Sequence, residues 1–97
     1  MAARHGHAVN LGAAGERAEA ARLLDAVVRD SVGVLGADHP DTLTARFNLA
    51  VNLGAAGERA EAARLLDAVV QDSVRVLGAD HPDTLTSRRA QQFFEGK

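Results

Sequence analysis

The sequence contains no cysteine, tryptophan or tyrosine, and only three of its 97 residues, all phenylalanine, are aromatic. Without cysteine the chain has neither a disulfide framework nor a thiolate metal site; this fits a reducing compartment, and we expect a cytoplasmic protein. The shortage of aromatic residues disfavours β-structure, because strands are rich in aromatic and β-branched side chains. Twenty alanines favour helices instead, since alanine loses no side-chain entropy in a helix.

The chain also lacks a surplus of positive charge and any long apolar run. Its net charge of −2 means that it cannot hold many phosphates, which argues against nucleic acid as the main partner. No apolar run approaches the ~18 residues that span a bilayer, and residues 1–10 lack the apolar stretch of a signal peptide. We therefore expect one domain over residues 1–97, or a piece of a longer array, with no membrane partner.

What the sequence does have is an internal repeat of 42 residues. Residues 8–44 realign on residues 50–86, and only two of these 37 positions differ. The differing pairs are Arg29 with Gln71 and Gly33 with Arg75. Such near-identity excludes chance and indicates recent duplication, or excision from a longer array. We place repeat 1 at about residues 1–39, repeat 2 at about 40–81 and a last helix at about 82–95.

Proline and glycine divide each repeat into two helices. Proline is tolerated only in the first turn of a helix, where its missing N–H would be unpaired anyway. A helix therefore begins at about Pro40, capped by Asp38 or His39, and runs until Gly57 breaks it. The same punctuation predicts another helix start at Pro82.

The second helix of repeat 2 runs over about 58–77. Its apolar residues recur at intervals of three and four, which gives one buried stripe, and Gly78 is placed to end the helix in a left-handed cap. The same pattern predicts helices over about 2–14 and 16–35 in repeat 1. The expected core residues of the repeats are Leu11, Ala20, Leu24, Val27, Phe47, Leu49, Leu53, Ala62, Leu66 and Val69.

The last helix begins like a first helix of the repeat and then departs from it. Arg89-Ala90-Gln91-Gln92 stands where repeat 2 has Phe47-Asn48-Leu49-Ala50, and Phe93-Phe94 follows. Replacing inward apolar residues by arginine and glutamine predicts a solvating end cap. The predicted fold is all-α: an α-solenoid of antiparallel helix hairpins, with two repeats and a C-terminal capping helix.

The order and spacing of these residues resemble a tetratricopeptide repeat of the longer, kinesin-light-chain type. The resemblance covers nearly the whole chain and rests on Asn48-Leu49-Ala50, Leu53, Gly57-Glu58-Arg59-Ala60-Glu61-Ala62, Leu66, Val69 and the connector over residues 77–84. It implies a right-handed superhelix of helix pairs whose concave face binds a peptide or partner protein. Where some relatives clamp a peptide carboxylate with basic residues, this chain has Thr44, Phe47 and Val51, so recognition of a C-terminal carboxylate is not expected.

Candidate partner-binding residues lie on the first helices. Asn48 and Asn52 are four apart on one helix and Asn10 repeats Asn52, so these amides form a polar strip suited to a peptide backbone. Arg46 and Arg88 recur at equivalent places. They either line the groove for an acidic peptide or are solvated charges, and we favour the second interpretation.

We expect no enzyme, no cofactor and no metal site. His5 and His7 are two apart, which places them on different sides of a helix, while His39 and His81 belong to the connectors. The carboxylates of the second helices lie beside arginine on a solvated face, and no serine there has a neighbouring histidine to activate it.

The ends of the array suggest an alternative function. Each repeat leaves an apolar flank for the next one, and isolated arrays usually need about three repeats for stability. Residues 1–3 begin directly in the expected first helix, without a cap, and near-identical units make one end complementary to the other. Beside peptide binding we therefore keep a second hypothesis, a homo-oligomer formed by end-to-end stacking or by helix exchange.

Overall fold

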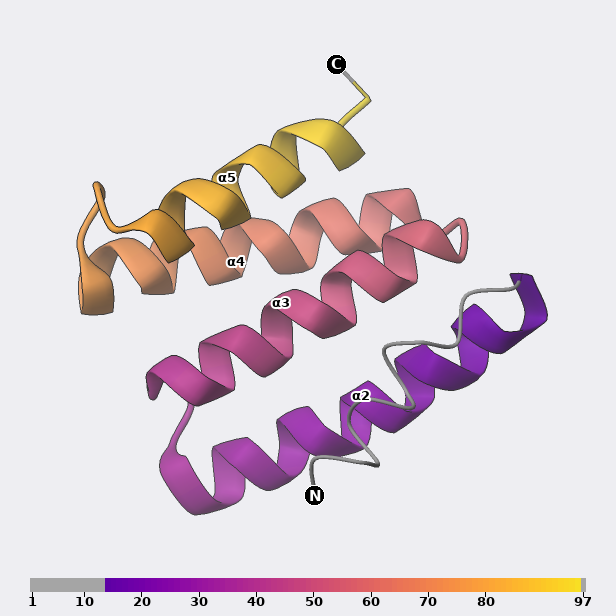
Figure 1. Ribbon diagram of the computed structural model, residues 1–97, viewed down its shortest axis with the longest axis horizontal. Coiled ribbons are helices and arrows are strands. Elements are labelled where there is room, and N and C mark those ends of the chain that lie inside the picture. Colours follow the sequence, from indigo (N-terminus) through magenta and orange to yellow (C-terminus); the bar gives the residue numbers. More distant parts are fainter. Residues whose placement is uncertain (1–13, 97) are drawn as a thin grey trace.

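A computed structural model describes residues 14–96, with side chains from Glu19 onward, and its helices run antiparallel in sequence order (Figure 1). The described helices are α2 (Ala14–Leu35), α3 (Pro40–Ala55), α4 (Arg59–Leu77) and α5 (Pro82–Phe94). This part of the chain contains no strand, so the all-α prediction is confirmed. The helix expected over 2–14 lies almost wholly outside the described residues, as do Leu11 and Asn10.

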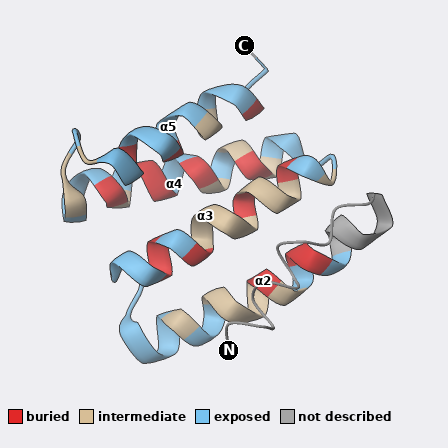
Figure 2. Ribbon diagram, in the orientation of Figure 1, coloured by how far each residue is buried: buried red, intermediate tan, exposed pale blue. Residues whose placement is uncertain are grey.

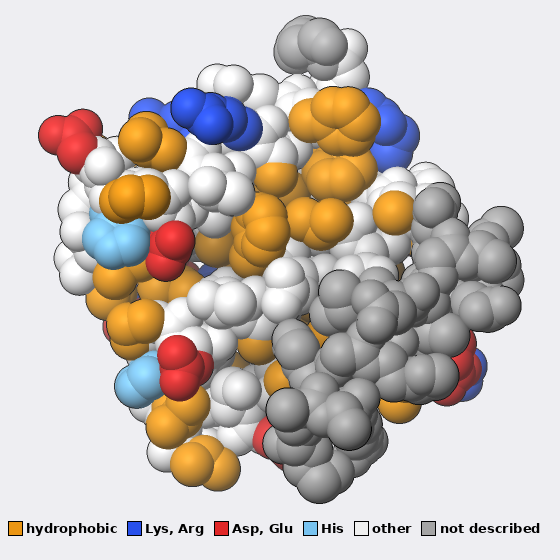
Figure 3. Space-filling model, in the orientation of Figure 1, with side chains coloured by type: hydrophobic (Ala, Val, Ile, Leu, Met, Phe, Trp, Pro, Cys, Tyr) orange, Lys and Arg blue, Asp and Glu red, His pale blue; other side chains and the backbone are white. Residues whose placement is uncertain are grey.

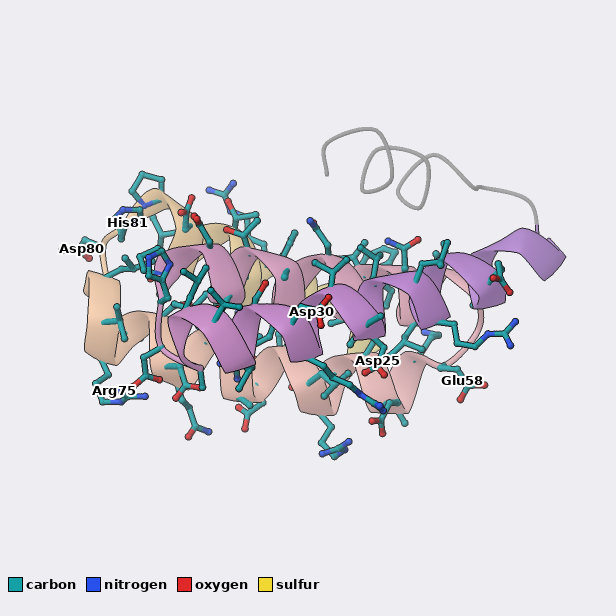
Figure 4. All side chains as sticks on the ribbon, turned by 90° about the horizontal axis from the view of Figure 1, so that it is seen from below. Asp25, Asp30, Glu58, Arg75, Asp80 and His81 are labelled. Atoms are coloured by element: carbon teal, nitrogen blue, oxygen red, sulfur yellow. The ribbon has the colours of Figure 1, made fainter. Side chains whose placement is uncertain are left out.

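Each helix packs against its neighbour in sequence, and α3 also touches α5. When the molecule is turned by 90°, α4 lies below α3 and α5 (Figure 4). The first helices of successive units, α3 and α5, therefore share one face of the stack. This is the arrangement expected of helix hairpins in a solenoid.

The helices α3 and α5 begin in the same way. His39 and His81 have extended backbone, and the Nδ1 atom of each accepts a hydrogen bond of 3.0 Å from the backbone N–H two residues on. Proline then occupies the first helical position and aspartate the next, at the positive end of the helix dipole. Of the two residues predicted as possible N-caps of α3, His39 and not Asp38 accepts the capping hydrogen bond.

Glycine ends α4, although not in the conformation that we expected. Gly78 has φ 104° and ψ 152°, so its φ is positive as predicted, but its ψ lies far from the left-handed helical region. Its N–H donates to the carbonyl oxygens of Ser73 and Val74 at 3.1 and 3.0 Å. The predicted left-handed cap is therefore wrong in detail: a single positive-φ glycine turns the chain out into the connector.

The start of α2 also differs from the prediction. Gly15 was expected to separate two helices, as its counterpart Gly57 does with φ 103°, but α2 runs from Ala14 through Gly15 without a break. Glycine permits a break in a helix and does not impose one, so identical residues end a helix in one repeat and continue it in the other.

The core lies where α4 meets α3 and α5 (Figure 2). Five of the expected core residues are buried: Ala20, Leu24, Ala62, Leu66 and Val69. The others within the described residues are only half-buried: Val27, Phe47, Leu49 and Leu53. A stack of single helices leaves a flank of each helix open, and this is why these side chains are not enclosed.

The helix α5 is held in place by Phe94, a residue that the repeat pattern does not place in the core. Its ring packs into the core cluster with Ala50 and Leu66 and lies against Gly54, where a Cβ atom would overlap it. Arg59 covers the same end: its guanidinium donates to the Phe93 carbonyl oxygen at 2.9 Å and lies 5.3 Å from the Phe93 ring centroid. Of the residues predicted to form the solvating end cap, Arg89 and Gln92 are exposed, whereas Gln91 is half-buried and donates to Asp67 Oδ1 of α4 at 3.1 Å.

Candidate functional site

A hollow of about 230 Å³ opens between α3 and α5, with α4 as its floor. Figure 3 looks onto the face that α3 and α5 share, where hydrophobic side chains gather over both helices. The residues that line the hollow are Pro40, Leu43, Thr44, Phe47 and Asn48 from α3, Val69, Ser73 and Leu77 from α4, and Asp83, Thr86 and Ser87 from α5.

Helical spacing explains this lining. Residues three and four apart lie on one face of a helix, so Thr44 and Asn48 of α3 follow each other along one wall. Thr86 is the counterpart of Thr44 one repeat later and stands on the opposite wall. The hollow thus combines apolar side chains, from Leu43, Phe47, Val69 and Leu77, with polar groups on both walls and the Ser73 hydroxyl in its floor.

The polar groups of the α3 wall differ in whether they are already bonded. The Thr44 hydroxyl donates to the Pro40 carbonyl oxygen at 3.2 Å, within its own helix. The Asn48 side chain makes no hydrogen bond within the described part of the chain, and only its backbone oxygen is used, by Asn52 Nδ2 at 3.0 Å. Asn48 is therefore the wall residue whose amide is available to a ligand.

The structure separates the candidate partner-binding residues. Asn48 lines the hollow, whereas Asn52 is half-buried and bonded within its own helix. Arg46 points to the joint with α4 instead of the groove, and Arg88 is exposed on α5. Asn10 lies outside the described residues. Sequence reasoning missed Ser73, Asp83 and Thr86. The sequence holds a signal for Thr86, which repeats Thr44 one unit later.

The pattern of the tetratricopeptide repeat family matches residues 1–41 and 42–83, which is most of the chain. The chain belongs to the tetratricopeptide repeat family. Members of this family are non-catalytic modules that generally mediate protein–protein interaction, and the resemblance drawn from the sequence is confirmed. No curated protein and no solved structure matches the chain.

The joint between the two tetratricopeptide repeats is held by four charged residues, Asp38, Arg46, Asp72 and Arg75, which we call the inter-repeat charge cluster. Arg46 Nη1 lies 2.9 Å from Asp72 Oδ2 and donates to the Ala37 carbonyl oxygen at 3.3 Å. Arg75 holds both oxygens of Asp38, at 2.8 and 3.0 Å, and reaches Asp72 Oδ1 at 2.8 Å. The cluster ties the connector of repeat 1 to both helices of repeat 2.

The cluster also shifts the pKa values of its members. The hydrogen bond from Arg75 is the main cause that holds the pKa of Asp38 below its ordinary value. For Asp72, partial burial raises the pKa, but the hydrogen bonds from Arg75 and Arg46 together outweigh it and the pKa is lowered. The hydrogen bond to Asp38, followed by that to Asp72, raises the pKa of Arg75. Asp38, Asp72 and Arg75 are therefore charged in the folded tetratricopeptide repeats at neutral pH.

Two kinds of feature are not found in the part of the chain that the structure describes. No three side chains of His, Cys, Asp or Glu come together there in a way that would hold a metal ion. None of the helices over residues 14–96 is long and apolar enough to cross a membrane. The described residues do contain the hollow over α4 and the inter-repeat charge cluster.

Proposed function

We propose that the chain binds a partner protein through an extended peptide segment that lies between α3 and α5. The hollow is the observation that carries this proposal, because it combines apolar side chains with the unbonded amide of Asn48 on one wall. A large apolar side chain of the partner fills the hollow, where full burial of a leucine-sized group contributes roughly 1.5–3 kcal/mol. Asn48 and Thr86, on opposite walls, bond the backbone of the segment.

The charge at the hollow favours a basic residue beside this anchor. Asp83 is the charged residue of the lining, while Arg46 is engaged by Asp72 in the inter-repeat charge cluster. An acidic peptide would meet the Asp83 carboxylate without an arginine to offset it. The partner segment therefore carries an apolar anchor next to lysine or arginine.

A display library of short random peptides, selected against the intact chain, tests this function. The affinity of a selected peptide is then measured by fluorescence anisotropy for the wild type and for Thr86→Trp, which fills the hollow. We expect binding to weaken about tenfold or more, which corresponds to about 1.4 kcal/mol. The matched control is Gln71→Trp, at an exposed position of α4 outside the hollow. If no peptide is enriched, or if both variants bind equally well, the groove is not the binding site.

We propose self-association through the ends of the repeat stack as a second function, because one observation favours it. The side chains that pair at the internal joint recur at the two ends of the described chain. Arg88 on α5 is the counterpart of Arg46, Asp30 on α2 is the counterpart of Asp72, and neither has an ion-pair partner among the described residues. Sedimentation velocity over a range of concentrations is the test, and a constant monomer mass at high concentration contradicts self-association.

A further inference from the structure

We propose that copies of the chain join head to tail, with α5 of one copy packing on α2 of the next as α3 packs on α4 within the chain. The inference rests on the self-association proposed above, and it specifies which surfaces meet and which charges pair. The partner at both ends is thus a second copy of the same chain. The template for the contact between molecules is the internal joint, by which we mean the contact of residues 36–46 with α4 inside each molecule.

The tail end repeats the first half of the internal joint. Residues 78–88 match residues 36–46 except for serine in place of Ala45, so the connector, the histidine cap and the arginine all recur. What differs is the covering: Leu43 is 4% exposed at the internal joint, whereas its counterpart Leu85 is 40% exposed. In α5, Leu85 is therefore exposed and Arg88 has no ion-pair partner among the described residues. At the internal joint their counterparts are buried (Leu43) and ion-paired (Arg46).

The head end repeats the second half of the joint. Residues 14–35 match residues 56–77 except at the two positions that distinguish the repeats, so α2 carries Asp30 where α4 carries Asp72. Val34 is 82% exposed, whereas its counterpart Val76 is 37% exposed. Asp30 lies on the helix nearest the viewer when the molecule is seen from the α2 end (Figure 4). This end therefore presents Asp30, a carboxylate suited to Arg88, and the exposed apolar side chain of Val34.

The two ends lie on opposite edges of the stack (Figure 1), so the contact is heterologous. Arg88 of one copy meets Asp30 of the next, as Arg46 meets Asp72 at 2.9 Å inside the chain. A heterologous contact leaves a free end on each side, so it generates an open chain unless the rotation between copies closes a ring.

Three features make this joint weaker than the internal one. Gly33 stands in place of Arg75, so Asp80 of the neighbouring copy, the counterpart of Asp38, lacks the arginine that would hold it. On α5, arginine and glutamine replace Phe47 and Ala50, which reduces the apolar area that the joint buries. The sequence of residues 1–13 also repeats part of the sequence of α3, with Arg4 in the place of Arg46, so it is suited to the same flank of α2. The association is therefore reversible and depends on concentration.

A charge exchange between the ends tests the inference. Sedimentation velocity at low salt is run on the wild type, on Arg88→Asp and on Asp30→Arg, with folding checked by circular dichroism. Each variant places like charges across the joint, and we expect its association constant to fall about tenfold or more. An equimolar mixture of the two variants restores opposite charges at every joint between unlike copies, so it associates at the wild-type level again. Arg64→Asp, which changes the charge by the same amount on the exposed surface of α4, leaves association unchanged.

A second variant acts in the opposite direction. Gly33→Arg restores the side chain that holds Asp38 at the internal joint, now facing Asp80 of the next copy, and strengthens association about tenfold. If the wild type shows no dependence of mass on concentration, the proposed self-association itself fails. If the wild type associates and neither end variant changes it, self-association stands and the head-to-tail joint is overturned.

Discussion

Gly54 and Gly33 both lie in the last turn of a helix, Gly54 in α3 and Gly33 in α2, but only Gly54 is in contact with α5. A Cβ atom at Gly54 would overlap the Phe94 ring, whereas nothing lies within 4 Å of one built at Gly33. Alanine is favoured over glycine inside a helix by roughly 0.5–1 kcal/mol. The same substitution therefore has opposite expected signs at the two sites.

Gly54→Ala is expected to lower the free energy of unfolding by about 1–3 kcal/mol, because overpacking displaces Phe94 from the core. Gly33→Ala is expected to raise it by about 0.5–1 kcal/mol. Urea unfolding followed by circular dichroism measures both. A Gly54→Ala protein as stable as Gly33→Ala would show that the ring of Phe94 does not need this space.

The histidine caps lead to a second prediction for single residues. His81→Ala removes the acceptor for the Asp83 N–H and is expected to lower the free energy of unfolding by about 0.5–2 kcal/mol, the range for loss of an N-cap. His81→Asn keeps an acceptor at this position and should retain most of the stability. Equal losses in the two variants, measured by urea unfolding, would mean that the cap hydrogen bond contributes nothing.

The caps and the placement of Phe94 differ in how far the sequence predicts them. A histidine before Pro-Asp predicts a helix start because proline permits only the first turn. Phe94, by contrast, is the counterpart of Asn52 and Asn10, so alignment of the repeats places a polar residue there. Phe94 is buried because Gly54 and Ala50 of α3 leave room for its ring beside Leu66 of α4. A repeat pattern does not show this room, since it depends on how α5 packs on the other two helices.

At the scale of helices, the inter-repeat charge cluster sets how repeat 2 sits on the connector of repeat 1. The sequence shows that Asp72 and Arg75 are three apart, a spacing that brings them together on one helix. It does not show that Arg75 also holds Asp38, 37 residues earlier, because that contact depends on how the helices cross. The same limit applies to the hollow: the amide of Asn48 was predictable as a candidate, but the opposite wall on α5 was not.

The cluster predicts how stability depends on pH. The pKa values of Asp38 and Asp72 are lowered in the folded state, so their ionised forms favour folding. This contribution is complete above the ordinary range of a carboxyl group near 4 and is lost as the pH falls through that range and below it. We expect Arg75→Gln to be less stable than the wild type at neutral pH, and the difference to shrink on acidification.

Urea midpoints measured from neutral to acid pH provide the check. Arg64→Gln is the control, since it removes an arginine whose partner Glu61 lies in the same helix. A difference between wild type and Arg75→Gln that stays constant at every pH would mean that Arg75 stabilises by packing of its side chain alone.

At the scale of the whole molecule, each helix contacts mainly its neighbours in sequence. Substitution of the same residue in two repeats therefore destabilises different parts of the molecule. Leu24 and Leu66 are counterparts and both are fully buried, but among the described helices α4 packs on both α3 and α5, whereas α2 packs mainly on α3. In such arrays each unit is stabilised by contacts with its immediate neighbours.

Leu66→Ala is therefore expected to cost about 2–5 kcal/mol and to weaken α3, α4 and α5 together. Leu24→Ala should cost less and act mainly on α2. Hydrogen exchange of backbone amides distinguishes the two outcomes, because protection is lost across three helices in one case and in one helix in the other. Equal loss of protection in all helices for both variants would show that the stack unfolds as one unit.

The hollow over α4 bears on how many binding sites an assembly of several copies would offer to a partner. It needs a first helix on each side, so the proposed head-to-tail joint would bring α5 of one molecule and α3 of the next together over α2 and would create a further site of the same outline. In that site Arg89 would stand where the hollow within the chain has Phe47, so two kinds of site would alternate along one face of the proposed assembly. A partner with several evenly spaced anchors would bind such an assembly with avidity and a single anchor would not, which makes recognition depend on the concentration of the repeat protein itself.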